Sequence, residues 1–377
     1  MTAVDLPYGA RPLRARVPDR ATIVAPEPAR GVASLPACFD RALAHPVGAP
    51  PLSAADRVTV VVSDPTRAEP RAHLVAAVLR RLGDPAHVTL AIATGTHGPC
   101  DVAALGLPGG LLARCRVVNH DARDDGQLVQ VGTTRRGTPL VVHRCLVEAD
   151  LVVATGVIRP HYFAGFGAGA KALFPGLGQD RAVRVNHEWK RNPAAVAGRV
   201  DGNPCREDLE EIVDALACEV HVLNAIAGPG GAIIGAVAGE PRAALRAGAQ
   251  ACAEAFRARA PDADAIVVSD ALPLTGSVYQ ASKLVAAVAP KLRPGGRIVV
   301  AAQCPHGTGP VDVVNRGIYE IGLRPRLPDR HELLLVSDLP GAEVARTYFV
   351  PAASVEAALD GVRGDVLVVT RGGDVLW

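Results

Sequence analysis

The segment from Gly156 to Gly178 constrains the fold of this chain more than any other part of the sequence. It follows the apolar run 150–155, which is typical of a buried strand. It is rich in glycine, which lets a backbone approach a ligand closely, and it contains His161 and Lys171. Because α/β proteins bind ligands where strands end in such residues, the segment indicates a ligand site. The alternative is a glycine-rich turn with one solvated lysine and one hydrogen-bonded histidine.

The composition is that of a globular enzyme. The chain has 377 residues, enough for two domains, with 49% hydrophobic and 21% charged residues. A net charge of +2 gives no reason to expect a nucleic-acid partner or binding to an anionic membrane. Aromatic residues make up only 3%, too few for a platform that stacks bases. No apolar run is long enough to span a bilayer. We therefore expect neither a nucleic-acid nor a membrane partner, and the sequence leaves the oligomeric state open.

The eight cysteines are scattered and form no CxxC pair, which argues against a zinc ribbon or a thioredoxin-like motif. The N-terminal residues carry charges without the long apolar segment of a secretory signal. We therefore expect a cytoplasmic location and free thiols.

Strand and helix patterns alternate along the chain, which predicts an α/β fold. We expect two domains, each with a largely parallel sheet flanked by helices, and an active site in the cleft between them. The first would span residues 1–258, as a cofactor-binding and catalytic domain, and the second residues 262–377. Residues 1–57 are rich in proline and predict irregular structure with one short helix near Ala33–Leu43. A hairpin is expected over Gln127–Val142.

Polar residues follow several of the predicted strands and helices. One group comes directly after the strand 58–62 and another after the strand 88–93; these carry Asp64, Thr66, Arg67 and His97. Hydroxyls and an arginine at the start of a helix suit a phosphate group, although such residues also cap ordinary turns. His187 lies on a predicted helix, and Gln280 and Lys283 lie one turn apart on another. Each alone has a structural explanation; together they favour a site.

These motifs, taken in order, resemble the nickel-pincer lactate racemases and their 2-hydroxy acid racemase and epimerase relatives. The resemblance covers most of the chain. It rests on Asp64-Pro65-Thr66-Arg67, Gly95-Thr96-His97, Pro160-His161 through Lys171 to Pro175-Gly176, Asn186-His187, and Gln280 with Lys283. The family interconverts mirror-image 2-hydroxy acids by moving a hydride to and from a cofactor, with a keto acid as the intermediate.

The resemblance implies a cofactor and a role for each residue. The cofactor is the nickel-pincer nucleotide, a pyridinium-3-thioamide-5-thiocarboxylic acid mononucleotide that carries nickel. Lys171 would be joined to it through a thioamide, and His187 would bind the nickel, for which a neutral imidazole is a suitable ligand. His97 and His161 would be the paired acid and base. The remaining cofactor-binding residues would be Asp64, Thr66, Arg67, Gln280 and Lys283. Transient partners would be the proteins that make the cofactor.

Two positions depart from the lactate-specific members. Arg159 replaces an acidic or neutral residue and points to the same side as His161 in an extended segment. It would bind a second substrate carboxylate or be a solvated surface arginine. Near the C-terminus, Tyr348 or Phe349 replaces a tryptophan that covers the site. The departures leave the identity of the 2-hydroxy acid open.

Two other functions fit parts of the pattern. A metal-dependent hydrolase or lyase would use His97, His161 and His187 as ligands, although neither an HxH nor an HExxH motif is present. A non-catalytic carrier of the nickel cofactor would need neither His97 nor His161.

Overall fold

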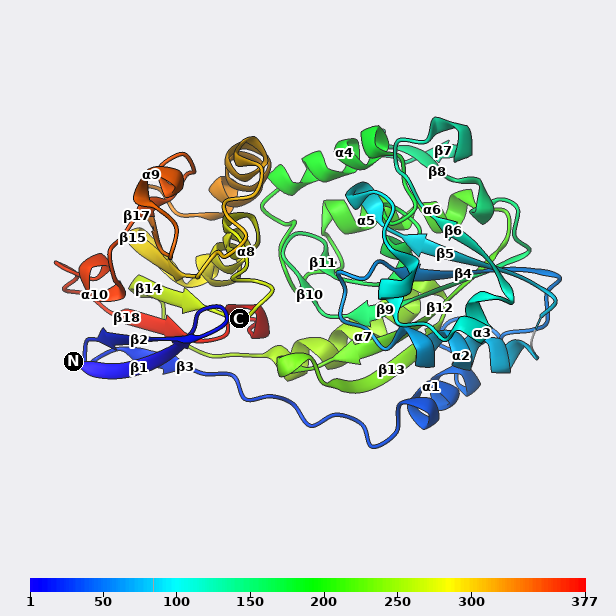
Figure 1. The fold of residues 1–377 in the computed structure, drawn as a ribbon, viewed down its shortest axis with the longest axis horizontal. Coiled ribbons are helices and arrows are strands. Elements are labelled where there is room, and N and C mark those ends of the chain that lie inside the picture. The colour runs from blue at the N-terminus through cyan, green and yellow to red at the C-terminus, as the bar shows by residue number, and fades with distance from the viewer. Residues whose placement is uncertain (84) are drawn as a thin grey trace. The chain divides into compact units, whose positions relative to one another are not determined.

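The computed structural model describes residues 1–83 and 85–377. The chain forms two compact units (Figure 1). The central unit comprises Pro28–Trp189 and Ala194–Ala255, and the terminal unit comprises Met1–Glu27, Lys190–Pro193 and Phe256–Trp377. Each unit contains a six-stranded sheet. The α/β class expected from the sequence is confirmed.

The sheet of the central unit has the strand order β13-β12-β9-β4-β5-β6. Neighbouring strands are parallel, apart from the antiparallel pair β12 and β13. The bounds are β4 Arg57–Ser63, β5 His87–Ala93, β6 Cys115–Asn119, β9 Leu151–Ile158, β12 Glu219–Ala227 and β13 Ile233–Gly239. The parallel strands are runs of branched and other apolar residues, because such strands are buried on both faces.

Alternate residues of these strands pack into two cores on opposite faces of the sheet. On β4, Val60 and Val62 join the core beneath α1 and α2, whereas Val61 joins the core beneath α4, α5 and α6. Figure 1 shows these two groups of helices on either side of the sheet. The helices of this unit are α1 Leu35–Ala44, α2 Arg71–Leu82, α3 Gly109–Leu112, α4 Asp180–Glu188, α5 Pro204–Glu210, α6 Ile212–Ala215 and α7 Pro241–Phe256.

Smaller elements complete the central unit. Strands β7, Leu128–Thr133, and β8, Pro139–His143, pair antiparallel and confirm the predicted hairpin. Strands β10, Pro160–His161, and β11, Gly165–Phe166, form a second, shorter hairpin. The 3₁₀ helix η5, Gly169–Ala172, follows it.

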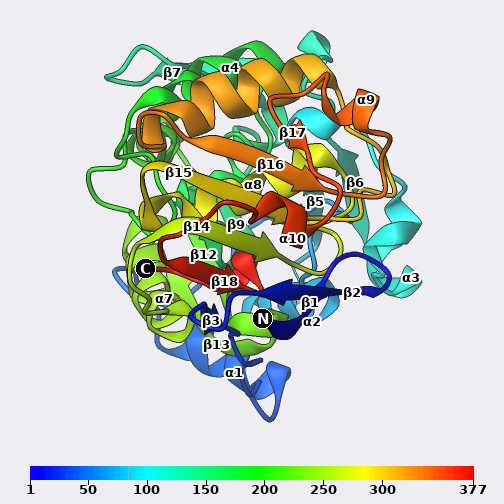
Figure 2. The same ribbon diagram turned by 90° about the vertical axis from the view of Figure 1, so that its left-hand side faces the viewer.

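The terminal unit has an all-parallel sheet of order β17-β16-β15-β14-β18-β3. Figure 2 shows β16, β15, β14 and β18 side by side. The strands are β3 Thr22–Val24, β14 Ala263–Ser269, β15 Leu292–Ala301, β16 Glu332–Val336, β17 Val350–Pro351 and β18 Val366–Val369. The helices are α8 Val278–Val288, the π-helix η9 Val313–Leu323, α9 Gly341–Val344 and α10 Val355–Ala358.

The N-terminal segment differs from the expected irregular structure with one short helix. The short helix predicted there is present as α1, but the residues before it form three strands rather than irregular structure. Strands β1, Thr2–Pro7, and β2, Pro12–Val17, form a hairpin whose inward side chains join the core of the terminal unit. Strand β3 pairs with β18, so residues 1–27 lie with the C-terminal part of the chain and not with the domain predicted over 1–258.

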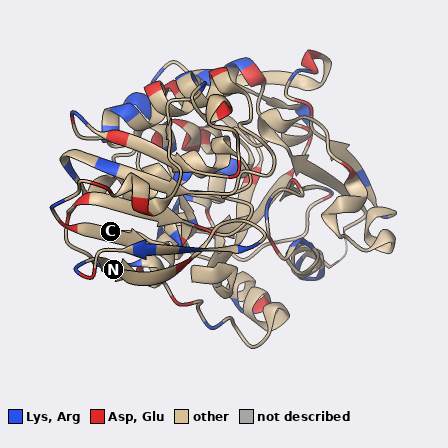
Figure 3. Ribbon diagram, turned by 60° about the vertical axis from the view of Figure 1, so that its left-hand side comes forward, with Lys and Arg blue, Asp and Glu red and all other residues tan. Residues whose placement is uncertain are grey.

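Charged residues of both signs are present in nearly equal numbers, which gives the chain its small net charge of +2. Acidic and basic positions are both scattered over the ribbon in Figure 3. Among the described residues, no helix is both long and apolar enough to cross a bilayer.

Candidate active site

The polar residues of the central unit gather where its parallel strands end. Asp64 follows β4, His97 follows β5, and His161 follows β9 after two residues. Strands β4, β5 and β9 are parallel neighbours, so the loops that follow them emerge at one edge of the sheet. The local sequence explains these loops, since each strand ends where apolar residues give way to Ser, Thr, Pro or Gly.

Asp64 and His97 form a direct pair at this edge. His97 Nδ1 lies 2.8 Å from Asp64 Oδ2, and the backbone N–H of Thr66 donates to Asp64 Oδ1 at 2.8 Å. The Thr66 hydroxyl donates to the same oxygen. Burial raises the pKa of Asp64, but the hydrogen bonds from His97 and Thr66 outweigh burial and lower this pKa to about 2. Asp64 is therefore an ionised carboxylate. It holds the exposed His97 ring through the ring nitrogen Nδ1.

A buried arginine that the sequence reasoning missed holds this loop. Arg71 lies in the first turn of α2; its Nε donates to the carbonyl of Ser63 at 2.9 Å, and its Nη2 donates to the carbonyls of Asp64 and Arg67. Glu69 pairs with Arg71 at 3.2 Å and accepts from the Ser63 N–H. Burial raises the pKa of Glu69. With its carbonyls held from inside, the loop presents Arg67 to solvent.

Contacts through Phe163 join two of the predicted histidines. The His161 and Phe163 rings meet edge to face with centroids 4.6 Å apart, and the Phe163 and His187 rings do so at 4.9 Å. Phe163 itself is buried. His161, on β10, and His187, on α4, therefore contact the same aromatic ring.

The loop after β5 also contacts the segment that carries Lys171. The N–H of Gly95 donates to the carbonyl of Gly176 at 2.8 Å. At Gly176 a Cβ would lie 2.2 Å from the carbonyl oxygen of Ala172, so only glycine fits there. Lys171 lies on η5, half-buried, five residues before this close approach. The structure thus brings the loops that carry His97 and Lys171 together.

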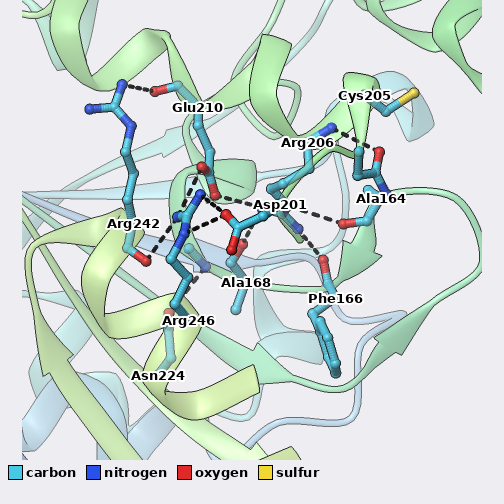
Figure 4. A network of polar contacts seen from close by, with 12 residues as sticks. Ala164, Phe166, Ala168, Asp201, Cys205, Arg206, Glu210, Asn224, Arg242 and Arg246 are labelled. Atoms are coloured by element: carbon cyan, nitrogen blue, oxygen red, sulfur yellow. Dashed lines mark hydrogen bonds and ion pairs between the residues drawn. The ribbon is translucent and has the colours of Figure 1, made fainter. Parts of the chain in front are cut away.

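A second buried arginine holds the glycine-rich segment (Figure 4). Arg206, on α5, is fully buried; its Nε donates to the carbonyl of Ala164 at 3.0 Å and its Nη1 to that of Ala168 at 3.4 Å. Its Nη2 donates to the carbonyl of Phe166. Burial lowers the pKa of Arg206 to about 10, so the guanidinium stays charged at neutral pH. Glu210, 3.9 Å away, supplies the opposite charge.

The arrangement explains an unusual backbone conformation beside Lys171. Ala168 has a φ of 61°, which is uncommon for a residue other than glycine. Arg206 holds its carbonyl, and the side-chain oxygen of Asn224 accepts from the next N–H, that of Gly169, at 3.1 Å. A backbone in this region persists where the surroundings fix it on both sides.

The remaining predicted residues are placed as follows. Gln280 and Lys283 lie on α8 of the terminal unit, where Lys283 Nζ donates to Gln280 Oε1 at 2.6 Å, which confirms that they share a helix face. Tyr348, also in the terminal unit, stacks on Tyr319 with ring centroids 4.7 Å apart; its hydroxyl is buried, and burial raises its pKa. Arg159 is exposed, and its role stays a prediction.

The described residues contain no cluster of three or more His, Cys, Asp or Glu side chains that can hold a metal ion. His97, His161 and His187 therefore do not form the three-ligand site that a metal-dependent hydrolase requires. A single imidazole, such as that of His187, fits a metal whose other ligands belong to a cofactor.

Comparison with known proteins decides the family. A family model, the lactate racemase N-terminal domain, matches residues 8–198. The chain belongs to the lactate racemase family. Racemases are isomerases, and this family membership makes the protein an enzyme of that class.

Relatives match nearly the whole chain. The lactate racemase of Thermoanaerobacterium thermosaccharolyticum is 28% identical over 95% of this chain and 94% of its own length. That of Lactiplantibacillus plantarum is 28% identical over 82% of this chain and 76% of its own length. Among solved structures, the lactate racemase apoprotein from T. thermosaccharolyticum has a TM-score of 0.87 at 26% identity, covering 100% of this chain and 99% of that one. A Thermotoga maritima protein shares the fold, with a TM-score of 0.63 at 18% identity over 91% of this chain and 96% of that one.

Proposed function

We propose that this protein interconverts the stereoisomers of a 2-hydroxy acid. The observation that carries the proposal is the Asp64–His97 pair, which lies at the same sheet edge as the loops of His161 and Lys171. A racemase must serve both faces of one carbon, and two histidines on separate loops supply a proton acceptor for each face. The named relatives, both lactate racemases, support the same reaction class.

We propose the nickel-pincer nucleotide as the cofactor. Lys171 would form the covalent tether, His187 would bind nickel, and Thr66, Arg67, Gln280 and Lys283 would bind the nucleotide. The donor set fits this group, because Lys171 offers an amine on the glycine-rich segment and His187 offers a single imidazole. When bound, the cofactor supplies an electrophile that accepts a hydride from C2 and returns it, which no amino-acid side chain does.

His97 and His161 handle the hydroxyl proton. Asp64 accepts only, so the proton of a neutral His97 lies on Nδ1, and Nε2 is left to take the proton of the substrate hydroxyl. The resulting imidazolium is stabilised by the Asp64 carboxylate and later returns the proton. The same Asp64 was predicted to bind the cofactor; its contacts favour a role in orienting His97.

His161 serves the opposite enantiomer, but its ring is held differently. The N–H of Ala164 donates to His161 Nδ1 at 3.2 Å, so in the neutral ring the proton lies on Nε2. In this resting state His161 Nε2 offers the substrate a hydrogen bond, and action as a base at Nε2 requires the other tautomer, with the proton on Nδ1.

The test is turnover on a panel of chiral 2-hydroxy acids after the protein has been loaded with the cofactor, followed by chiral chromatography. We expect one or more acids to racemise, and His97→Gln and His161→Gln each to reduce the rate by about 10²-fold or more. Binding of the cofactor without turnover of any acid would favour the carrier, and zinc-dependent cleavage of a substrate would favour the hydrolase or lyase. The proteins that make the cofactor would be transient partners in the cytoplasm.

A further inference from the structure

A chain of hydrogen bonds, buried at Asp208 and Asn186, reaches His187. It runs from Asp208 on α5 through Asn186 on α4 to the imidazole. We propose that Asp208 and Asn186 fix the tautomer of His187, with the proton on Nδ1 and the lone pair on Nε2, before any cofactor binds. The inference deepens the proposed function, on which the role of His187 as a nickel ligand rests.

Asp208 is the fixed end of this chain. It is fully buried and accepts hydrogen bonds from the hydroxyls of Thr134 and Thr138, which lie at the turn between β7 and β8. The N–H of Thr138 donates to the Thr134 hydroxyl at 3.0 Å, which fixes the direction of that hydroxyl's own proton. The carboxylate is therefore held by a turn from one side and by α4 from the other.

Asn186 can take only one orientation beside Asp208. Its Nδ2 donates to Asp208 Oδ2 at 2.7 Å and to the carbonyl of Cys205 at 3.2 Å. A backbone carbonyl accepts and never donates, so the amide nitrogen has to face α5. The amide oxygen then faces the other way, and Asn186 is fully buried, which prevents water from competing for it.

The amide oxygen sets the state of His187. Asn186 Oδ1 lies 3.2 Å from His187 Nδ1, and because this oxygen only accepts, Nδ1 carries the proton. A neutral imidazole with its proton on Nδ1 has its lone pair on Nε2. Partners of this kind behind a metal-binding histidine orient the ring and raise its basicity, and their loss typically lowers metal affinity by about 10- to 100-fold. Phe163 packs edge to face on the ring and limits its rotation.

The first test needs neither cofactor nor activity. The cofactor-free protein, labelled with ¹⁵N-histidine, is measured by long-range ¹H–¹⁵N correlation NMR at about pH 8.5, where imidazoles are mostly neutral. His187→Gln assigns the signals. We expect His187 in the Nδ1–H form. A wild-type His187 in the Nε2–H form would overturn the inference outright, without any variant.

Variants separate the positioning role from a purely structural one. Asn186→Ala should release the Nδ1–H preference, and Thr134→Val, which removes one hydrogen bond to Asp208 but leaves Asn186, should keep it. Loaded Asn186→Ala should retain about 10- to 100-fold less nickel than the wild type after dialysis against a chelator. Unchanged nickel retention in a folded Asn186→Ala would contradict the inference.

The two proposals fail separately. If His187 shows the Nδ1–H form but no 2-hydroxy acid racemises, the inference stands and the proposed function falls. If the loaded protein racemises a 2-hydroxy acid while His187 shows the Nε2–H form, the proposed function stands and the inference falls.

Discussion

At Asp64 two opposing effects act on one carboxyl group. Burial favours the neutral form, and hydrogen bonds from His97 and Thr66 favour the ionised form more strongly. The same carboxylate then does two things, because it stabilises the fold of its loop and it orients the His97 ring. Asp64 and Thr66 are two residues apart, a spacing that is typical of a turn. His97, the other partner of Asp64, lies 33 residues away in the sequence, so this contact depends on the tertiary fold.

The lowered pKa of Asp64 predicts a pH dependence of stability. Because its folded pKa is below that of the unfolded chain, the stabilisation is present above about pH 4 and is lost as the pH falls through about 2. The shift corresponds to about 2 kcal/mol. Urea unfolding between pH 5 and pH 2.5 should show the advantage of wild type over Asp64→Asn shrinking over this window. An advantage that stays constant with pH would contradict the assignment, and His97→Gln should remove part of the effect.

Lys171 is the expected covalent tether. Intact mass spectrometry of the loaded wild type should show a cofactor adduct, and Lys171→Ala should lack it. Lys291→Ala is the matched control, since this lysine pairs with Asp262 on the terminal unit and should leave the adduct in place. An adduct that persists in Lys171→Ala would refute the tether at this residue.

At the scale of helices and strands, two buried arginines each fix the backbone of a segment that follows a strand. Arg71, at the start of α2, holds the loop after β4, and Arg206, on α5, holds the segment after β9. In both, the guanidinium donates to backbone carbonyls of the segment that it holds, and a buried glutamate lies beside it. Neither arginine stands out in the sequence, because its importance comes from burial and not from its neighbours in the chain.

Replacing Arg206 should destabilise the whole central unit. Arg206→Met removes the donors to three carbonyls and the partner of Glu210, and we expect a loss of about 3 kcal/mol or more in the free energy of unfolding. Arg184→Met is the control, because Arg184 forms an exposed pair with Asp180 that is worth less than about 1 kcal/mol. Chemical unfolding measures both, and equal losses in the two variants would contradict the role of Arg206.

For the whole molecule, the sequence predicts the α/β class, the hairpin between β7 and β8, and the strand ends that carry Asp64, His97 and His161. These follow from local apolar runs and the polar residues that end them. It did not predict that residues 1–27 lie with the C-terminal part, because β3 has only three residues and pairs with β18 more than 340 positions away. It also missed Asp208, whose role depends on contacts from α4 and from the β7–β8 turn.

The central claim is that hydride transfer, and not proton removal from carbon, interconverts the stereoisomers. The most direct measurement uses the loaded protein and the 2-hydroxy acid that turns over fastest, deuterated at C2, in ordinary water. We predict that the product keeps its deuterium at C2 while it racemises, because the hydrogen never exchanges with solvent and His97 and His161 move only the hydroxyl proton. Loss of the C2 deuterium to water at the rate of racemisation would contradict the account and would make His97 and His161 bases that act directly on carbon.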